Sequence, residues 1–463
     1  MNQETVMKPV ARVASALLLV LAWSGTATPA IAWHAAAVAV TEPLTAERGN
    51  RAAAAPTDGQ LAAVPNDDHA AVQRAAAQLA VVNAEAAYGN LTLPASLHGA
   101  AITWTSDHPA LVTATGEVTR PPGRDASTVL RATLRKGAAT ASRDVAVRVV
   151  KKFDKAADAA YLFVHFTFTE EKIHFSLSKG NSALDWRSLN HGKPVFTSTI
   201  GTTGLRDPYI VRSPDGDTFY LMATDLKWFK GDKGPDRKRY IQVWESHDLV
   251  NWSAQRDVLV APPEVQNTYA PEAVWDDSIG AYVVFWTSKI GSNDYFTPMY
   301  ATTRDFVTFT EAQVWQPGEW RIDSTVNKVG DWYYRYTKSI DQAHANCHDI
   351  VAERSKNLRA PRAQWQKVTS CTGAKAGVSE SEAPLAFKSN PGDIHGDYYY
   401  LWMERWIPNK TYVALRTRDV AQPQWQQVPV NFPDPLPKHG AILPITAAEA
   451  QALAAAYPST PAQ

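Results

Sequence analysis

Four carboxylates recur along the second half of the sequence, and each leads into a short apolar run. They stand in the segments GLRDPYI, APEAV, IDSTV and SEAPL and are Asp207, Glu272, Asp323 and Glu382. One ionised and one protonated carboxylate could together hydrolyse a glycosidic bond with inversion, because the first would deprotonate water and the second would protonate the leaving oxygen. A third carboxylate beside the acid would raise its pKa by like-charge repulsion. The four residues are therefore a candidate catalytic cluster, provided that the fold brings them together.

The spacing of the carboxylates predicts how the fold does so. They follow one another at intervals of roughly 50 to 65 residues, and each is followed by a turn and an aromatic strand, as in SPDGD before TFYLMATD. Self-similarity at such a period is typical of a β-propeller, with one small sheet per repeat, although a series of unrelated hairpins is the alternative. In a propeller the first strands of the blades converge on the axis, where the four carboxylates would meet.

Five blades account for the remaining repeats. Five segments contain a strand, a polar turn and an aromatic residue that opens an outer strand, namely Trp186, Trp252, Phe309, Trp365 and Trp425. The blade that begins at Tyr161 lacks an innermost strand, and the run HGAILPIT from His439 lacks a blade. Pairing the two would close the ring and remove two open sheet edges. The sequence thus predicts an all-β chain with a five-bladed propeller over 158–446 and a C-terminal tail over 447–463.

These motifs resemble those of glycoside hydrolase family 43, the five-bladed inverting glycosidases that include arabinanases, α-L-arabinofuranosidases and β-xylosidases. The resemblance implies that Asp207 in RDP is the general base, that Asp323 in IDST adjusts the pKa of the acid, and that Glu382 in EAP is the general acid. The sequence departs from the family pattern at Ser324, where a proline is usual, and at Ala383, where a glycine is usual. Glu380 is a competing candidate for the acid.

Further residues could bind substrate or a metal ion. Those that could contact the sugar are Arg206, Glu272, Arg335, Glu404 and Trp406. The resemblance implies no cofactor for the chemistry and allows a structural calcium ion at the axis, near His439. Calcium prefers oxygen ligands, so a water-mediated role or plain strand closure is the expectation for this histidine.

The N-terminal third is expected to contain no chemistry. Residues 1–32 have basic residues, an apolar run of about ten residues and a final AIA, as a cleaved export signal does. A flexible spacer is predicted over 33–70. Residues 71–150 alternate apolar and polar positions, which predicts an immunoglobulin-like β-sandwich; they resemble the shortened bacterial immunoglobulin-like domain often attached to secreted glycosidases, a spacer or docking module.

The composition agrees with an exported, water-soluble protein. The 463 residues contain 46 Lys and Arg against 46 Asp and Glu, so nothing steers the chain towards nucleic acid or an anionic membrane. Its two cysteines, Cys347 and Cys371, fit one disulfide in an oxidising compartment, with free thiols as the alternative. A secreted or periplasmic location follows, without membrane insertion.

The sugar stays open at this stage. The expected substrate is an oligo- or polysaccharide, cleaved by an α-L-arabinofuranosidase or β-xylosidase activity. The alternatives are a β-galactofuranosidase of the same fold and a sugar-binding propeller without catalysis. A retaining fructan-cleaving enzyme is disfavoured, because such enzymes use an Asn-Asp-Pro motif and this chain has Arg206 before Asp207. Specificity for one of these sugars depends on details of the loops around the pocket, and no sequence motif indicates them.

Overall fold

The computed structural model describes residues 67–228, 237–292, 295–318, 320–340, 348–378, 380–405 and 411–459. The predicted export signal, most of the predicted spacer, Trp406 and Cys347 lie outside the described residues. Cys371 is disulfide-bonded. Within the described residues, no helix is long and apolar enough to cross a membrane.

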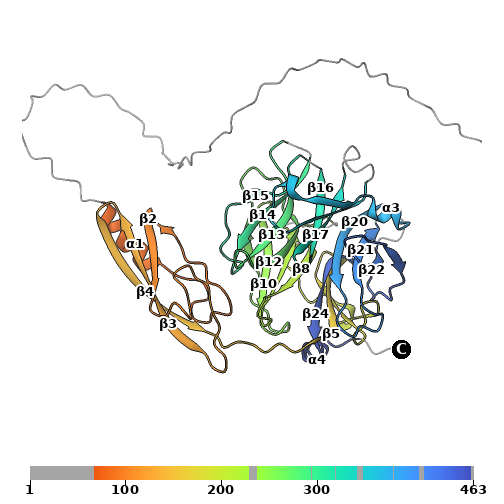
Figure 1. The fold of residues 1–463 in the computed structure, drawn as a ribbon, viewed down its shortest axis with the longest axis horizontal. Helices are drawn as coiled ribbons and strands as arrows, with labels where there is room; N and C mark the ends of the chain where they lie inside the picture. The colour runs from red at the N-terminus through yellow and green to blue at the C-terminus, as the bar shows by residue number, and fades with distance from the viewer. Residues whose placement is uncertain are drawn as a thin grey trace, which may run out of the picture. The chain divides into compact units, whose positions relative to one another are not determined.

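The first domain is an antiparallel sheet with a helix packed on it (Figure 1). The helix is α1 (Asp67–Gln78), and the strands pair in the order β1 (Ser96–Leu97), β2 (Ala100–Ser106), β3 (Ala126–Lys136) and β4 (Ala139–Val149). Val72 and Ala75 of the helix pack against Ile102 and Leu134 of the sheet. The predicted spacer is therefore too long, because its last four residues form the first turn of α1. The buried alanines and valine of this helix form a core face only by packing against the sheet, so the sequence alone did not show it.

The second domain consists of five four-stranded antiparallel sheets, the blades of the predicted propeller (Figure 1). Four blades are continuous in the sequence. They are β8–β11 (Leu205–Arg212, Phe219–Asp225, Tyr240–Ser246, Arg256–Leu259), β12–β15 (Tyr269–Asp276, Ala281–Lys289, Phe296–Thr303, Gln313–Val314), β16–β19 (Arg321–Val329, Trp332–Ser339, Ile350–Ser355, Gln366–Thr369) and β20–β23 (Ser381–Lys388, Tyr399–Arg405, Thr411–Thr417, Gln426–Val428).

The fifth blade joins the two ends of the domain, as predicted. Strand β24 (Pro437–Thr446) pairs antiparallel with β5 (Asp158–Thr167), which continues to β6 (His174–Ser178) and β7 (Trp186–Ser188). The first strands contact one another around the whole ring, β8 with β12, β12 with β16, β16 with β20, β20 with β24 and β24 with β8. The five-bladed fold and its closure by the C-terminal strand are confirmed.

The segment after β24 is a helix and not the predicted tail. Helix α4 (Ala447–Ala456) begins with a capping box, in which the Thr446 side chain accepts from the Glu449 backbone and the Glu449 side chain accepts from the Thr446 backbone. The carboxylate of Glu449 also binds Arg212 of β8 at 2.7 and 2.8 Å. Leu453 is fully buried against the blades. The helix therefore anchors the closing strand through Glu449 and Leu453.

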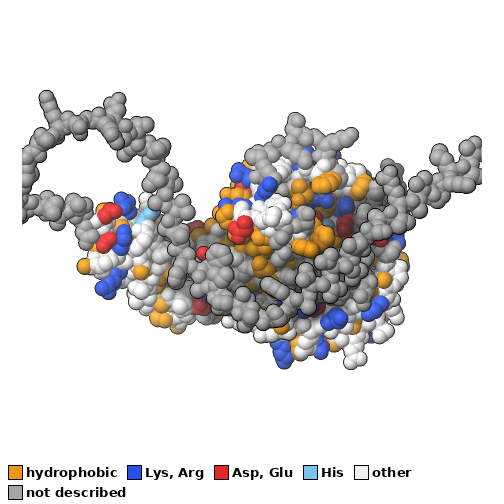
Figure 2. All heavy atoms as spheres, turned by 90° about the horizontal axis from the view of Figure 1, so that it is seen from above, with side chains coloured by type: hydrophobic (Ala, Val, Ile, Leu, Met, Phe, Trp, Pro, Cys, Tyr) orange, Lys and Arg blue, Asp and Glu red, His pale blue; other side chains and the backbone are white. Residues whose placement is uncertain are grey.

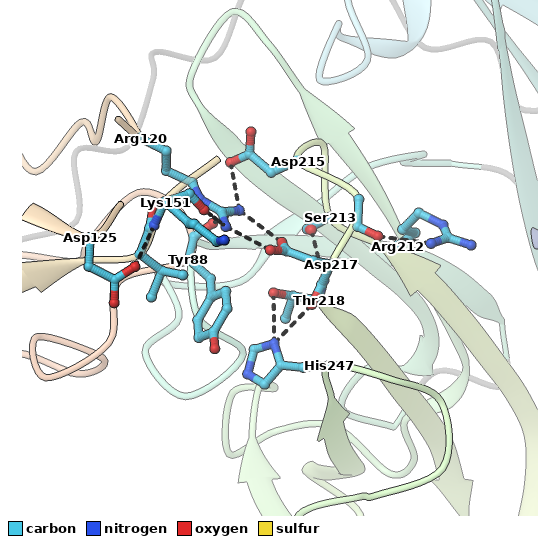
Figure 3. Close-up of polar contacts among 12 residues, drawn as sticks. Tyr88, Arg120, Asp125, Lys151, Arg212, Ser213, Asp215, Asp217, Thr218 and His247 are labelled. Carbon is cyan, nitrogen blue, oxygen red and sulfur yellow. Dashed lines mark hydrogen bonds and ion pairs between the residues drawn. The ribbon is translucent and has the colours of Figure 1, made fainter. Parts of the chain in front are cut away.

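Polar contacts join the first domain to turns of the propeller (Figure 3). Arg120 donates to both carboxylate oxygens of Asp217, at 2.8 and 2.6 Å, in the turn after β8. The rings of Tyr88 and His247 are stacked with centroids 4.0 Å apart. Arg304, after β14, donates to Glu117 at 2.7 Å. These turns lie where the first strands end, whereas the four carboxylates lie where those strands begin, so these contacts are remote from the candidate chemistry.

Candidate active site

A β-bulge interrupts the first strand of every blade near its beginning. The register shifts lie between Arg206 and Tyr209 in β8, Tyr269 and Glu272 in β12, Ile322 and Ser324 in β16, Glu382 and Leu385 in β20, and Lys438 and Gly440 in β24. A bulge inserts an extra residue and redirects its neighbours, and bulges are common beside active sites. All five bulges lie at the same end of the ring, which we call the hub.

Positive backbone φ angles mark the bulge residues. Asp207 has φ +48° and Asp323 has φ +54°, while in two other blades the angle belongs to Ala270, two residues before Glu272, and to Ala383, directly after Glu382. Such angles are costly for residues with a side chain and persist where the surroundings enforce them, often at functional sites. The four carboxylates are therefore brought to one hub, but the two aspartates are the bulge residues themselves and the two glutamates flank one.

Asp207 is paired with His439. The Asp207 Oδ1 and His439 Nδ1 atoms are 3.2 Å apart. Burial opposes the charge on Asp207, but the hydrogen bond and charge of His439, with help from Arg206, hold the pKa of Asp207 below its ordinary value. Burial likewise disfavours the imidazolium, yet Asp207 and the neighbouring carboxylates raise the pKa of His439 to about 9. At neutral pH Asp207 is therefore ionised, as a general base must be.

Glu382 is in the opposite state. Burial, followed by repulsion from Asp323 and Glu404, raises the pKa of Glu382 to about 7, and the two cations Lys338 and Lys438 oppose the rise. A carboxylic acid with this pKa is half protonated at neutral pH and can donate its proton. The sequence predicted that repulsion from Asp323 raises this pKa; in the structure burial is the largest cause and Asp323 the second.

Asp323 is coupled to the acid through the backbone. Its carboxylate accepts a hydrogen bond from the backbone N–H of Ala383, the residue after Glu382. Burial, followed by repulsion from Asp207 and Glu404, raises the pKa of Asp323 to about 6. At Ser324, where a proline was expected, the hydroxyl lies 3.0 Å from the Thr337 hydroxyl, and the preceding Asp323 has the positive φ of the bulge.

Glu272 is the fourth carboxylate at the hub. It is buried, its side chain bonds Thr325, and its Oε2 has no hydrogen-bond partner in the described part of the chain. Burial raises the pKa of Glu272 to about 8, so it is mostly neutral at pH 7. A neutral carboxyl can both donate and accept a hydrogen bond, which suits a sugar hydroxyl.

Two of the other candidates lie at the hub. Arg206 binds Glu171 at 2.9 Å and lies 4.7 Å from the centroid of the Phe166 ring. Glu404 is opposite Glu382 in the β20–β21 pairing. It binds Lys438 Nζ at 2.6 Å and accepts from the backbone N–H of His439. Arg206 and Glu404 therefore contact the segments around the strands that carry Asp207, Glu382 and His439.

Arg335 was predicted to contact the sugar but lies in the core. It is fully buried, binds Glu353 at 2.8 Å and stacks 3.8 Å from the centroid of the Trp365 ring. Arg321 and Arg362 bind the same glutamate. Arg335 therefore belongs to the packing between blades and does not reach substrate, because the face of β17 on which it lies is turned into the core.

Glu380 is a second correction. It was the competing candidate for the acid, but β20 begins at Ser381, and Glu380 precedes the strand with φ +54°. Sequence reasoning also missed Lys338 and Lys438, which follow aromatic or proline-rich runs and carry no motif. Their signal would have been a lysine at the hub end of a buried strand.

The residues present do not fit a directly coordinated calcium ion. In the parts of the chain that the structure describes, no group of three or more His, Cys, Asp or Glu side chains is arranged to hold a metal. The Nδ1 atom of His439 is engaged by Asp207, and its pKa favours a protonated ring, which cannot act as a ligand. We derive no step through calcium.

The hub end of the propeller exposes aromatic side chains. Figure 2 looks onto this end and shows hydrophobic side chains gathered over the blades. Phe168, Trp228 and Tyr295 are exposed and lie in loops at the hub ends of β5, β9 and β13–β14. Flat aromatic rings of this kind can stack against sugar rings.

Known protein families match both domains of the chain. Residues 157–451 match a family related to glycoside hydrolase family 43, described as "probable glycosyl hydrolase domain", and residues 72–152 match the atrophied bacterial Ig domain. A curated α-L-arabinofuranosidase of Bifidobacterium longum subsp. longum is 34% identical over 398 residues, covering 73% of this chain and 35% of that protein. The chain thus spans about a third of this relative's length.

Solved structures resemble the chain more distantly. A Cellvibrio cellulosa α-L-arabinanase complexed with arabinohexaose has 16% identity and a TM-score of 0.39, over 59% of this chain and 93% of that one. A family 43 β-1,3-galactosidase has 12% identity and a TM-score of 0.44, over 60% and 58%. We draw no conclusion about activity from likenesses at this level. The family match covers more than half of the sequence, and the chain therefore belongs to the glycosyl hydrolases related to glycoside hydrolase family 43.

Proposed function

We propose that this glycosyl hydrolase cleaves its substrate in a single displacement with inversion, with Asp207 as general base and Glu382 as general acid. The observation that supports the proposal is the contrast between two buried carboxylates at one hub. A histidine keeps Asp207 ionised, and burial beside two other carboxylates keeps about half of Glu382 protonated at neutral pH. Asp207 would deprotonate a water while Glu382 protonates the leaving oxygen, so no covalent intermediate forms.

The remaining hub residues would hold this machinery and the sugar. Asp323 fixes the backbone after the acid and adds negative charge beside it. Glu272 would bond a sugar hydroxyl through its unpartnered oxygen. The exposed aromatic rings around the hub would receive the flat faces of further sugar units.

For the substrate we propose a terminal α-L-arabinofuranosyl unit, following the curated relative. Purified protein would be assayed with the 4-nitrophenyl glycosides of α-L-arabinofuranose, β-D-xylopyranose and β-D-galactofuranose. A preference for the xyloside or the galactofuranoside would change the proposed substrate but would not contradict the proposed mechanism. Binding of oligosaccharides without turnover of any of them would support the sugar-binding alternative.

The mechanism has its own test. Asp207→Ala should abolish hydrolysis of every substrate, whereas Glu382→Ala should spare dinitrophenyl glycosides, whose leaving group departs without a proton. Proton NMR of the first sugar released, recorded before mutarotation, should show the inverted anomer. The anomer of the same configuration as the substrate would overturn the role of Asp207 as base.

We also propose that the protein is exported and cleaved after Ala32. The support is the leader-like composition of residues 1–32 together with the disulfide at Cys371, because disulfides persist in oxidising compartments. N-terminal sequencing of the mature protein should begin at Trp33. A mature protein that keeps Met1 would contradict it.

A further inference from the structure

A buried lysine from the neighbouring blade contacts the strand that carries Glu382. Lys338, near the end of β17, is only 6% exposed. Its Nζ donates to the backbone oxygen of Ser381 at 2.7 Å and to that of His348 at 3.0 Å. Ser381 is the first residue of β20 and directly precedes Glu382. The ammonium group therefore links two blades at the point where the strand of the acid begins.

The side chain of Ser381 is held by a second set of contacts. The Ser381 hydroxyl donates to Asp349 Oδ1, and the backbone N–H groups of Gly373 and Ala374 donate to the same carboxylate at 3.2 and 2.8 Å. Ser381 is fully buried. Its backbone oxygen and its hydroxyl are thus fixed by separate partners, and the start of β20 has little freedom to move.

Making this link with a buried lysine costs free energy. Burying an ammonium group costs free energy unless charges compensate it, and here burial does lower the pKa of Lys338. The charges that face it are those of Glu382, Asp349, Glu380 and Asp323. An uncharged donor would satisfy the two backbone oxygens, so the retained charge indicates a role towards the carboxylates.

We propose that Lys338 is the positioning residue of the general acid: it fixes the start of β20 through Ser381 and places a positive charge beside Glu382. The inference rests on the proposed function of Glu382. Proton transfer to the leaving oxygen needs hydrogen-bond geometry, so a small displacement of β20 would damage it. The charge would also limit how far repulsion and burial raise the pKa of Glu382, towards which Asp323, Glu404 and Lys438 also face.

The test compares Lys338→Met with Lys338→Arg and with the matched control Lys328→Met. Lys328 lies on β16 with its side chain 40% exposed and bound to Asp277 in a turn remote from the hub. Lys338→Met should lower kcat/KM for the 4-nitrophenyl glycoside about tenfold or more and that for the dinitrophenyl glycoside less than about threefold. Its alkaline limb of kcat/KM should move to higher pH, because a positive charge beside the acid is lost. Lys338→Arg should keep the alkaline limb of the unmodified protein, and Lys328→Met should match that protein in every respect.

Equal losses on both glycosides with an unmoved alkaline limb would overturn the proposal and leave Lys338 a structural residue, and so would an absence of any loss. If Lys338→Met does not fold, Lys338→Gln keeps an N–H donor, removes the charge and gives the same pH readout. Glu382→Ala is measured alongside. If that variant shows no dependence on the leaving group, the proposed function itself fails; if it does and Lys338→Met does not, only the role of Lys338 is wrong.

Discussion

Replacing Asp323 by asparagine should shift the alkaline limb of the pH profile towards lower pH. The pKa of Glu382 is about 7, against an ordinary value of 4.5, and repulsion from Asp323 is the second cause of this rise, after burial. A nearby like charge commonly contributes about one pKa unit, which would place the pKa of Glu382 near roughly 6 in Asp323→Asn. At pH 7 the protonated fraction of the acid would fall from about one half to roughly one tenth, so kcat/KM should fall about fivefold.

The effect should fade in acid. The pKa of Asp323 itself is about 6, so below that pH Asp323 is neutral and its replacement removes no charge. Values of kcat/KM for the 4-nitrophenyl glycoside from pH 4 to 9 would show the displaced limb and a convergence with the unmodified protein near pH 5. Asp331→Asn is the matched control, because Asp331 lies in the β16–β17 turn with its side chain 84% exposed. An unmoved limb, or an equal loss at pH 5 and pH 7, would refute the reasoning.

Three further predictions concern the scaffold. A chain ending before Lys438 lacks β24, so β5 loses its partner and the protein should aggregate or fail to melt cooperatively; a monodisperse truncation with a sharp calorimetric transition would contradict the closed ring. Glu353→Gln leaves Arg335 buried without its counter-ion and should cost about 3–5 kcal/mol of unfolding free energy in urea titrations, and a loss below about 1 kcal/mol would argue against a buried ion pair. A chain beginning at Lys152 should keep kcat within about tenfold on a small glycoside but melt at a lower temperature, because Asp217 loses Arg120; a larger loss of kcat in the folded protein would implicate the first domain in the chemistry.

Much of the architecture could be predicted because it is written in local and periodic patterns. The blade period, the turn before each aromatic strand and the aromatic residues that open the outer strands are all visible as spacing. Even the closure by HGAILPIT followed from counting strands. One blade lacked an inner strand and one strand lacked a blade, so pairing the two completes the ring. The candidate catalytic carboxylates were found for the same reason, because each stands at the same place in its repeat.

Only the tertiary structure decided which way the charged residues face and what state they are in. Arg335 and Lys338 lie three residues apart on β17, and no pattern shows that one is enclosed between tryptophans while the other reaches across to Ser381. The side-chain period of a strand is two, so a bulge or a shift of one residue exchanges its faces. The opposite shifts in the pKa of Asp207 and Glu382 likewise depend on burial and on a histidine more than two hundred residues from Asp207. The sequence by itself determined that carboxylates would gather at a hub; only packing, which sets each group's distance from water and from other charges, decided which of them is poised as base and which as acid.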